Sequence, residues 1–119
     1  MTGARVLVLE DNDLAARALI HVLELRGYCC QGVATAFDAL ERLPLFDPEI
    51  VLYEWSLFAE SGVGLARRMR LVKPKLFIVA LSAADEPIGF CRDEGIDGYL
   101  TKPFSFVDLQ ALLATRPMQ

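Results

Sequence analysis

Val6-Leu7-Val8-Leu9-Glu10-Asp11-Asn12-Asp13 is the stretch that decides how this chain folds. Its first half is a continuous run of β-branched and aliphatic residues, as expected of a strand that is covered on both faces. Its second half is acidic, and Asn12-Asp13 offers the N-terminal cap of a helix. The stretch therefore predicts a buried strand that leads directly into a helix.

The predicted first helix has an apolar stripe at helical spacing and should end at Gly27. The stripe has the spacing i, i+3, i+4, i+7 and i+8 and consists of Ala15, Ala18, Leu19, Val22 and Leu23. We expect this stripe to face the sheet, and we expect Leu14, Ile20 and Leu25 to lie off it.

The alternation of strand and helix continues along the rest of the chain. Further strands are predicted at 28–33, 50–55, 76–81 and 99–100, and further helices at 35–43, 62–72, 88–94 and 105–114. Pro44 should close the second helix, because proline cannot continue the backbone hydrogen bonding. Strands that alternate with helices pair in parallel through right-handed crossovers. We therefore expect an α/β fold, a doubly wound five-stranded parallel sheet, as one domain over residues 1–119.

The composition fits one cytoplasmic domain. With 119 residues, of which 54% are hydrophobic, the chain can bury a core of its own. Its formal net charge is −4 and its basic residues are scattered except at 67–70, so we expect no nucleic-acid-binding surface. We interpret the cluster at 67–70 as the solvated face of a helix.

The cysteines and the apolar segments also indicate the compartment. Cys29, Cys30 and Cys91 are odd in number and lie in apolar or helical settings, which predicts buried thiols in a reducing environment. No apolar run approaches the length of about 18 residues that a membrane span needs. We therefore expect a cytoplasmic location and no membrane contact.

Charged and polar residues follow the predicted strands at their carboxyl ends. Glu10 and Asp11 follow the first strand, Glu54 the third, Ser82 the fourth, and Lys102 the fifth. Ligands of a doubly wound sheet bind outside this edge. Three neighbouring carboxylates need a compensating cation, and Mg²⁺ is the default beside the single lysine. The alternative is that Glu10 and Asp11 merely stabilise the start of the first helix.

These residues belong to stretches that together resemble the receiver domain of two-component response regulators, over essentially the whole chain. The stretches are the opening strand with its acidic pair at 6–12, the segment 48–54 with Gly62 eight residues on, the segment 79–83, and 95–104 with its Thr-Lys-Pro-Phe ending. The resemblance implies a flavodoxin-like (βα)5 receiver fold.

The resemblance implies a magnesium site at this edge. Asp11 would be a direct Mg²⁺ ligand, and Glu10 would be a ligand through water. Glu54 stands at the phosphoacceptor position, and the backbone carbonyl of Ser56 would complete the protein's contribution.

The resemblance also implies a set of phosphoryl contacts. Ser82 would hydrogen-bond a phosphoryl oxygen, and Lys102 would neutralise its charge. Tyr99 would be the aromatic residue that moves inward on activation. The Lys102–Pro103 peptide bond would be cis, a state tolerated mainly before proline.

Glu54 departs from the family pattern, which uses an aspartate as the nucleophile that takes a phosphoryl group from a histidine kinase. The extra methylene displaces the carboxylate by roughly 1.5 Å, the length of one C–C bond. A misplacement on the order of 1 Å can cost about a hundredfold in rate. We therefore expect an atypical receiver that is not phosphorylated at Glu54.

Two consequences of Glu54 compete. Its carboxylate could extend toward Lys102 and Ser82, imitate the phosphorylated state and hold Tyr99 inward. Alternatively, the site is a relict, and the domain works as a scaffold that is indifferent to phosphate. In both cases the domain acts through protein–protein interaction.

Other functions remain open. An active receiver that accepts a phosphoryl group from a histidine kinase is the main alternative. A small flavodoxin-like enzyme is disfavoured, since no glycine-rich phosphate loop follows the first strand, and we expect no enzyme. The expected partner is a histidine kinase or another signalling protein, which Leu14 could help to dock. A homodimer could form through the face made by 88–94, 99–100 and 105–114.

Overall fold

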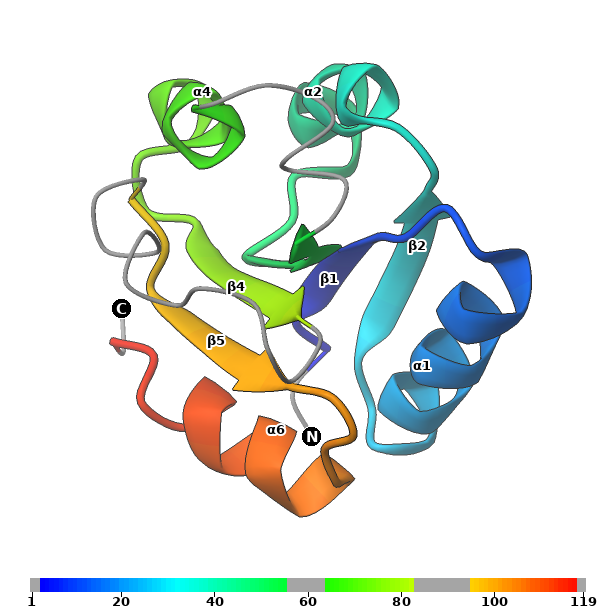
Figure 1. The fold of residues 1–119 in the computed structure, drawn as a ribbon. Helices are drawn as coiled ribbons and strands as arrows, with labels where there is room; N and C mark the ends of the chain where they lie inside the picture. The colour runs from blue at the N-terminus through cyan, green and yellow to red at the C-terminus, as the bar shows by residue number, and fades with distance from the viewer. Residues whose placement is uncertain (1–2, 56–63, 83–94, 118–119) are drawn as a thin grey trace.

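A computed structural model describes residues 3–55, 64–82 and 95–117 (Figure 1). Its strands are β1 (Arg5–Leu9), β2 (Cys29–Val33), β3 (Ile50–Glu54), β4 (Phe77–Ser82) and β5 (Gly98–Thr101). Its helices are α1 (Asp13–Leu25), α2 (Ala36–Phe46), α4 (Leu65–Val72) and α6 (Phe106–Leu113). The helix predicted at 88–94 lies outside the described residues.

The five strands form one parallel sheet in the order β2-β1-β3-β4-β5. The chain runs from β1 to its neighbour β2 on one side, and then crosses back to β3, β4 and β5 on the other side of β1. The direction of the connections therefore reverses once. This topology confirms the prediction of a doubly wound five-stranded parallel sheet. The carboxyl ends of β1, β3, β4 and β5 consequently lie along one edge, which we call the carboxyl edge, and their starts lie along the opposite amino edge.

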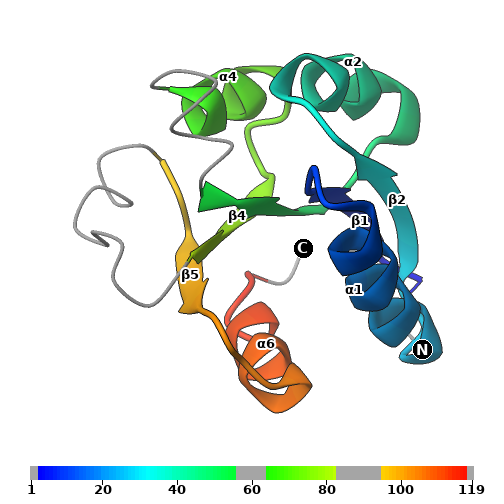
Figure 2. The same ribbon diagram turned by 45° about the vertical axis from the view of Figure 1, so that its right-hand side comes forward.

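Helices cover both faces of the sheet, with α2 and α4 on one face and α1 and α6 on the other (Figures 1 and 2). Alternate residues of β1 separate the two cores. Leu7 and Leu9 pack against the side of α2 and α4, and Val6 and Val8 pack against the side of α1 and α6. Full burial of each such side chain stabilises the fold by about 1.5–3 kcal/mol. This two-sided burial explains why the strand sequence is continuously apolar.

The prediction for α1 was right in its start and in Leu19 and Leu23 of its buried stripe, but wrong for the two alanines of that stripe. The Asn12 side chain accepts a hydrogen bond from Ala15 N at 2.9 Å and caps the helix. Ala15 and Ala18 are exposed, whereas Ala16 is buried and Ile20 packs against the core. Alanines on several sides of the helix made its rotation about the axis ambiguous in the sequence.

Two further expectations differ from the structure. Helix α2 passes through Pro44 and ends at Phe46, followed by the cap residue Asp47, whose backbone is left-handed at φ 54° and whose N–H donates to Leu43 O. A proline near the end of a helix removes only one backbone hydrogen bond. Cys29 is exposed and Cys30 half-buried, because they lie on the edge strand β2, while Cys91 lies outside the described residues.

No helix in the described ranges is long and apolar enough to cross a membrane.

Candidate receiver site at the carboxyl edge

Lys102 joins the carboxylates of Glu54 and Glu10 at the carboxyl edge. Its Nζ donates a hydrogen bond to Glu54 Oε1 and lies 3.6 Å from Glu10 Oε1. The two glutamate side chains are only 12% and 11% exposed, whereas the lysine is 40% exposed. Two largely buried carboxylates therefore share one ammonium group, and the sequence prediction that these three residues converge agrees with their placement.

The strand register explains why they meet. Leu9 at the end of β1 pairs with Tyr53 of β3, so Glu10 and Glu54 follow at the same level of the sheet. Lys102 follows β5, and its backbone N–H donates to Ser82 O at 2.7 Å at the end of β4. The Lys102–Pro103 peptide bond is cis, as the resemblance implies.

Glu10 also forms hydrogen bonds next to the start of α1. Its Oε2 accepts a hydrogen bond from Asn12 N at 3.1 Å, and its own N–H donates to Val33 O at 3.0 Å. One oxygen of Glu10 therefore stabilises the helix start, as one of the two interpretations has it, and the other faces Lys102, while its role as a Mg²⁺ ligand stays a prediction. The local bond to Asn12 was not foreseen, although a glutamate two residues before a helix cap is a usable signal.

The electrostatics of the three groups are coupled. Burial raises the pKa of Glu10 above its usual value, and the charge of Glu54 acts in the same direction. The Asn12 N–H and the charge of Lys102 oppose this rise without cancelling it. For Lys102, burial lowers the pKa, but the hydrogen bond and charge of Glu54 outweigh burial and raise it overall. Lys102 is therefore held as a cation.

Ser82 brings a buried hydroxyl to the same edge. The residue is 4% exposed, and its Oγ has no hydrogen-bond partner among the described residues. A buried hydroxyl without a partner is costly, of the order of 1–3 kcal/mol, and marks a position where another group can bind. Ser82 thus brings an unsatisfied hydroxyl to the carboxyl edge, and its role as a phosphoryl contact stays a prediction.

The other predicted residues are less closely engaged. Asp11 is exposed. Tyr99 on β5 is 42% exposed and pairs with Ala80 of β4 in the sheet. Ser56 lies outside the described residues. The structure therefore brings Glu10, Glu54, Ser82 and Lys102 to one edge and leaves Tyr99 turned at least partly to solvent.

The described side chains fit a magnesium ion poorly. Across residues 3–55, 64–82 and 95–117, no group of three His, Cys, Asp or Glu side chains is arranged to hold a metal ion. One oxygen of Glu10 faces Lys102 and the other accepts from Asn12. The ammonium group of Lys102 supplies the one positive charge that the sequence assigned to it, and the remaining charge, assigned to Mg²⁺, stays a prediction.

The comparisons with known proteins agree with this architecture. The family model for the response regulator receiver domain matches residues 6–114. This chain belongs to the response regulator receiver domain family. It is therefore a module of two-component signal transduction, and such receiver domains are generally not enzymes.

One curated relative of this receiver domain is the transcriptional regulatory protein BasR of Escherichia coli, 32% identical over 109 residues. The match covers 90% of this chain and 49% of BasR, so the chain spans about half the length of that relative.

Two solved structures are similar to this receiver domain in fold. A Burkholderia pseudomallei response regulator with a phosphorylated aspartic acid, a calcium ion and citrate is 26% identical with a TM-score of 0.82, and the match covers 92% of this chain and 66% of that one. The Saccharomyces cerevisiae receiver domain of Ssk1, crystallised with the histidine phosphotransfer protein Ypd1, is 20% identical with a TM-score of 0.81, over 95% and 88% of the chains.

Proposed function

We propose that this receiver domain works by protein–protein interaction that does not depend on phosphorylation of Glu54. The ion pair between Glu54 and Lys102 is the observation that carries this proposal. In a receiver the lysine would neutralise a phosphoryl group, and here the protein's own carboxylate already neutralises it. The pair thus occupies the lysine that a phosphoryl group would otherwise engage, without reproducing the other contacts of a phosphorylated site.

Glu54 is also a poor acceptor on geometric grounds. Phosphoryl transfer depends on in-line positioning and on charges arranged for the transition state. A carboxylate displaced by one methylene and held by Lys102 is outside the position where an aspartate would attack. We therefore propose that transfer from a histidine kinase to this residue is slow beyond functional use.

Of the two consequences of Glu54, the scaffold that is indifferent to phosphate has the better support. Mimicry should hold Tyr99 inward, yet Tyr99 is 42% exposed while the Glu54–Lys102 pair is formed. A carboxylate carries one negative charge, whereas a phosphoryl group carries up to two. The hydroxyl of Ser82 also lacks a partner within the described residues, although full mimicry would engage it.

We further propose that Mg²⁺ binds weakly at this edge. Glu10, Asp11 and Glu54 are the side chains that would hold it, together with a carbonyl of Ser56 outside the described residues. A magnesium ion would have to compete with Lys102 for both buried glutamates. When bound, Mg²⁺ would neutralise phosphoryl oxygens.

Incubation with acetyl phosphate and Mg²⁺, followed by intact mass spectrometry, tests the proposed function. We expect no gain of a phosphoryl group in the wild type or in Glu54→Gln. In Glu54→Asp, a gain would show that the rest of the site is competent. A gain in the wild type that Glu54→Gln abolishes would refute the proposal and restore the alternative of an active receiver.

The start of α1 is the proposed docking site for a histidine kinase or another signalling protein. Leu14 is 77% exposed in the first turn of α1, beside Glu10 and Asp11. Leu14→Arg should abolish binding of a purified partner and leave the melting temperature unchanged. Leu25→Arg is the matched control, because Leu25 is 69% exposed at the other end of the same helix. Equal loss of binding in both variants would reject this location.

A homodimer through the face of β5 and α6 is a second proposed interaction. Tyr99 and Val107 are 42% and 73% exposed on these elements, while the predicted third part of the face, 88–94, lies outside the described residues. Sedimentation equilibrium should show a concentration-dependent dimer that Val107→Glu weakens. A wild type that stays monomeric at all concentrations would reject this interface. The net charge of −4 supports no nucleic-acid partner for this domain.

A further inference from the structure

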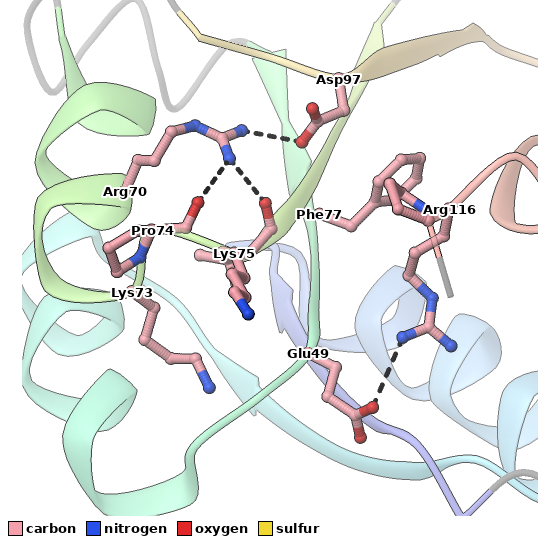
Figure 3. A pocket seen from close by; sticks show the side chains of 10 residues that line it. Glu49, Arg70, Lys73, Pro74, Lys75, Phe77, Asp97 and Arg116 are labelled. Carbon is pink, nitrogen blue, oxygen red and sulfur yellow. Dashed lines mark hydrogen bonds and ion pairs between the residues drawn. The ribbon is translucent and has the colours of Figure 1, made fainter. Parts of the chain in front are cut away.

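A pocket of about 470 Å³ opens at the amino edge of the sheet, opposite Glu54 and Lys102 (Figure 3). It lies between the end of α4, the starts of β3, β4 and β5, and the segment that follows α6. Its lining residues are Glu49, Arg70, Lys73, Pro74, Lys75, Leu76, Phe77, Asp97, Arg116 and Pro117. The volume is within the roughly 300–1,000 Å³ that is usual for small-molecule sites.

Arg70 forms a fixed wall of this pocket. Its Nη1 donates to Leu76 O at 2.8 Å and Pro74 O at 3.3 Å, and its Nη2 donates to Gly95 O at 2.6 Å. Nη2 also lies 2.7 Å from Asp97 Oδ2, which in turn accepts from Ile78 N at 2.8 Å. The expectation that 67–70 is wholly a solvated face is thus wrong for Arg70. A wall held by this many bonds needs little reorganisation when a ligand binds.

The exposed apolar surface of the pocket comes from Pro74 and Pro117. Leu76 and Phe77 also line the pocket but are only 1% and 6% exposed. Apolar surface with a few convergent polar groups is the usual composition of a site for a small organic molecule.

Basic residues outnumber acidic ones around the pocket, whereas acidic residues outnumber basic ones in the whole chain. Four basic and two acidic residues line it, although the whole chain has 12 basic and 16 acidic residues. Among the described residues the guanidinium of Arg116 has one recorded contact, from Nη1 to Glu49 Oε2 at 3.4 Å. Lys73 pairs with Asp47 outside the lining, and Asp47 also pairs with Arg5 at 3.3 Å. Asp47 therefore serves two cations, and Arg116, with its single contact to Glu49, keeps donors available for a ligand.

We propose that this amino-edge pocket binds a small organic anion with an apolar ring and one carboxylate or phosphate group. The ring would lie against Pro74, Pro117 and the exposed part of Phe77, and the anionic group would lie between Lys73 and Arg116. This site is separate from Glu54 and does not rest on the function proposed above. Carboxylates and phosphates share the chemistry that the cations recognise.

Titration of the ¹⁵N-labelled chain with phenyl phosphate, benzoate and neutral benzamide tests the proposal. We expect saturable shifts of the backbone amides of Lys73, Leu76 and Arg116, with a dissociation constant on the order of 1 mM for an anion. Benzamide should bind at least tenfold more weakly, and a comparison of the two anions identifies the preferred group. No saturation by either anion, or equal binding of benzamide, would overturn the proposal.

Matched variants show whether the lining residues are responsible. Arg116→Gln should weaken binding of the better anion about fivefold to tenfold, because it removes a donor and a charge. Arg68→Gln is the control, since Arg68 is exposed on α4 and does not line the pocket. Thermal unfolding checks that both variants keep the fold. Unchanged affinity in a folded Arg116→Gln would overturn the assignment, as would an equal loss in Arg68→Gln.

Discussion

The two edges of the sheet use acidic residues in opposite ways. At the amino edge, Asp47, Glu49 and Asp97 each pair with at least one basic side chain of their own. At the carboxyl edge, Glu10 and Glu54 share one lysine, and the buried Ser82 hydroxyl has no partner in the described chain. The acidic residues of the amino edge are thus taken up by ion pairs that hold the fold together, whereas the carboxyl edge keeps a buried hydroxyl without a partner among the described residues.

The physical basis of this contrast is the supply of hydrogen-bond partners. Asp97 connects a side chain of α4 to the backbone of β4, so its carboxylate is satisfied by both a charge and an N–H. The carboxyl edge has more acceptors than donors, and its excess charge is tolerated because Lys102 is held as a cation. Variants at the two edges should therefore differ in the size of their stability loss and in the sign of their pH dependence.

The largest effect should come from Asp97→Ala at the amino edge. The variant leaves Arg70 without its carboxylate and Ile78 N without its acceptor. We expect a loss of about 3 kcal/mol in the free energy of unfolding, measured with urea. Asp97→Asn keeps an acceptor and should lose about half as much. A loss below about 0.5 kcal/mol for Asp97→Ala would show that this edge is not a structural anchor.

Lys102→Met should have the next largest effect, because it leaves two buried carboxylates without a cation. We expect a loss of about 2 kcal/mol at neutral pH, less than for a fully buried pair because the lysine is 40% exposed. Adding Glu54→Leu should recover most of the loss. Additive losses in the double variant would contradict a pairing between Glu54 and Lys102.

The smallest effect is a pH dependence of opposite sign at the two edges. The pKa of Glu10 is raised in the folded state. Its contribution to the free energy of unfolding is therefore complete below its unfolded pKa and is lost as the pH rises through its folded pKa. The folded pKa of Asp47 is lowered, chiefly by its hydrogen bond with Lys73, so its contribution is present above its unfolded pKa and is lost on acidification through the folded value.

Urea unfolding of Glu10→Gln and Asp47→Asn between about pH 3 and pH 7 measures the slope of the free energy of unfolding against pH. This range spans the unfolded pKa values of about 4. Each variant should remove one of the two slopes from the wild-type profile. Slopes of the same sign would mean that the edges do not differ in the way described.

The sequence was sufficient for most of the fold and for part of the candidate site. Runs such as Val6–Leu9 predicted buried parallel strands, because only a sheet covered on both faces has continuous apolar strands. The topology then brought Glu10, Glu54 and Lys102 together, since parallel strands share their carboxyl edge.

Features that depend on tertiary contacts could not be predicted in this way. Arg70 is part of a basic cluster in the sequence, and its partners Leu76 and Asp97 lie in the segments just before β4 and β5. The rotation of α1 was equally hidden, because alanine fits either a buried or an exposed position. The shared lysine was predicted only as a neighbour, since a strand pattern does not give side-chain distances.

The ammonium group of Lys102 offers the most direct measurement of the central claim, that Glu54 holds this lysine in place of a phosphoryl group. In ¹⁵N spectra of the lysine side chains at neutral pH, we predict a Lys102 ammonium signal with slow hydrogen exchange. The signal should disappear through fast exchange in Glu54→Gln. A Lys102 ammonium that exchanges equally fast in the wild type and in Glu54→Gln would contradict the account.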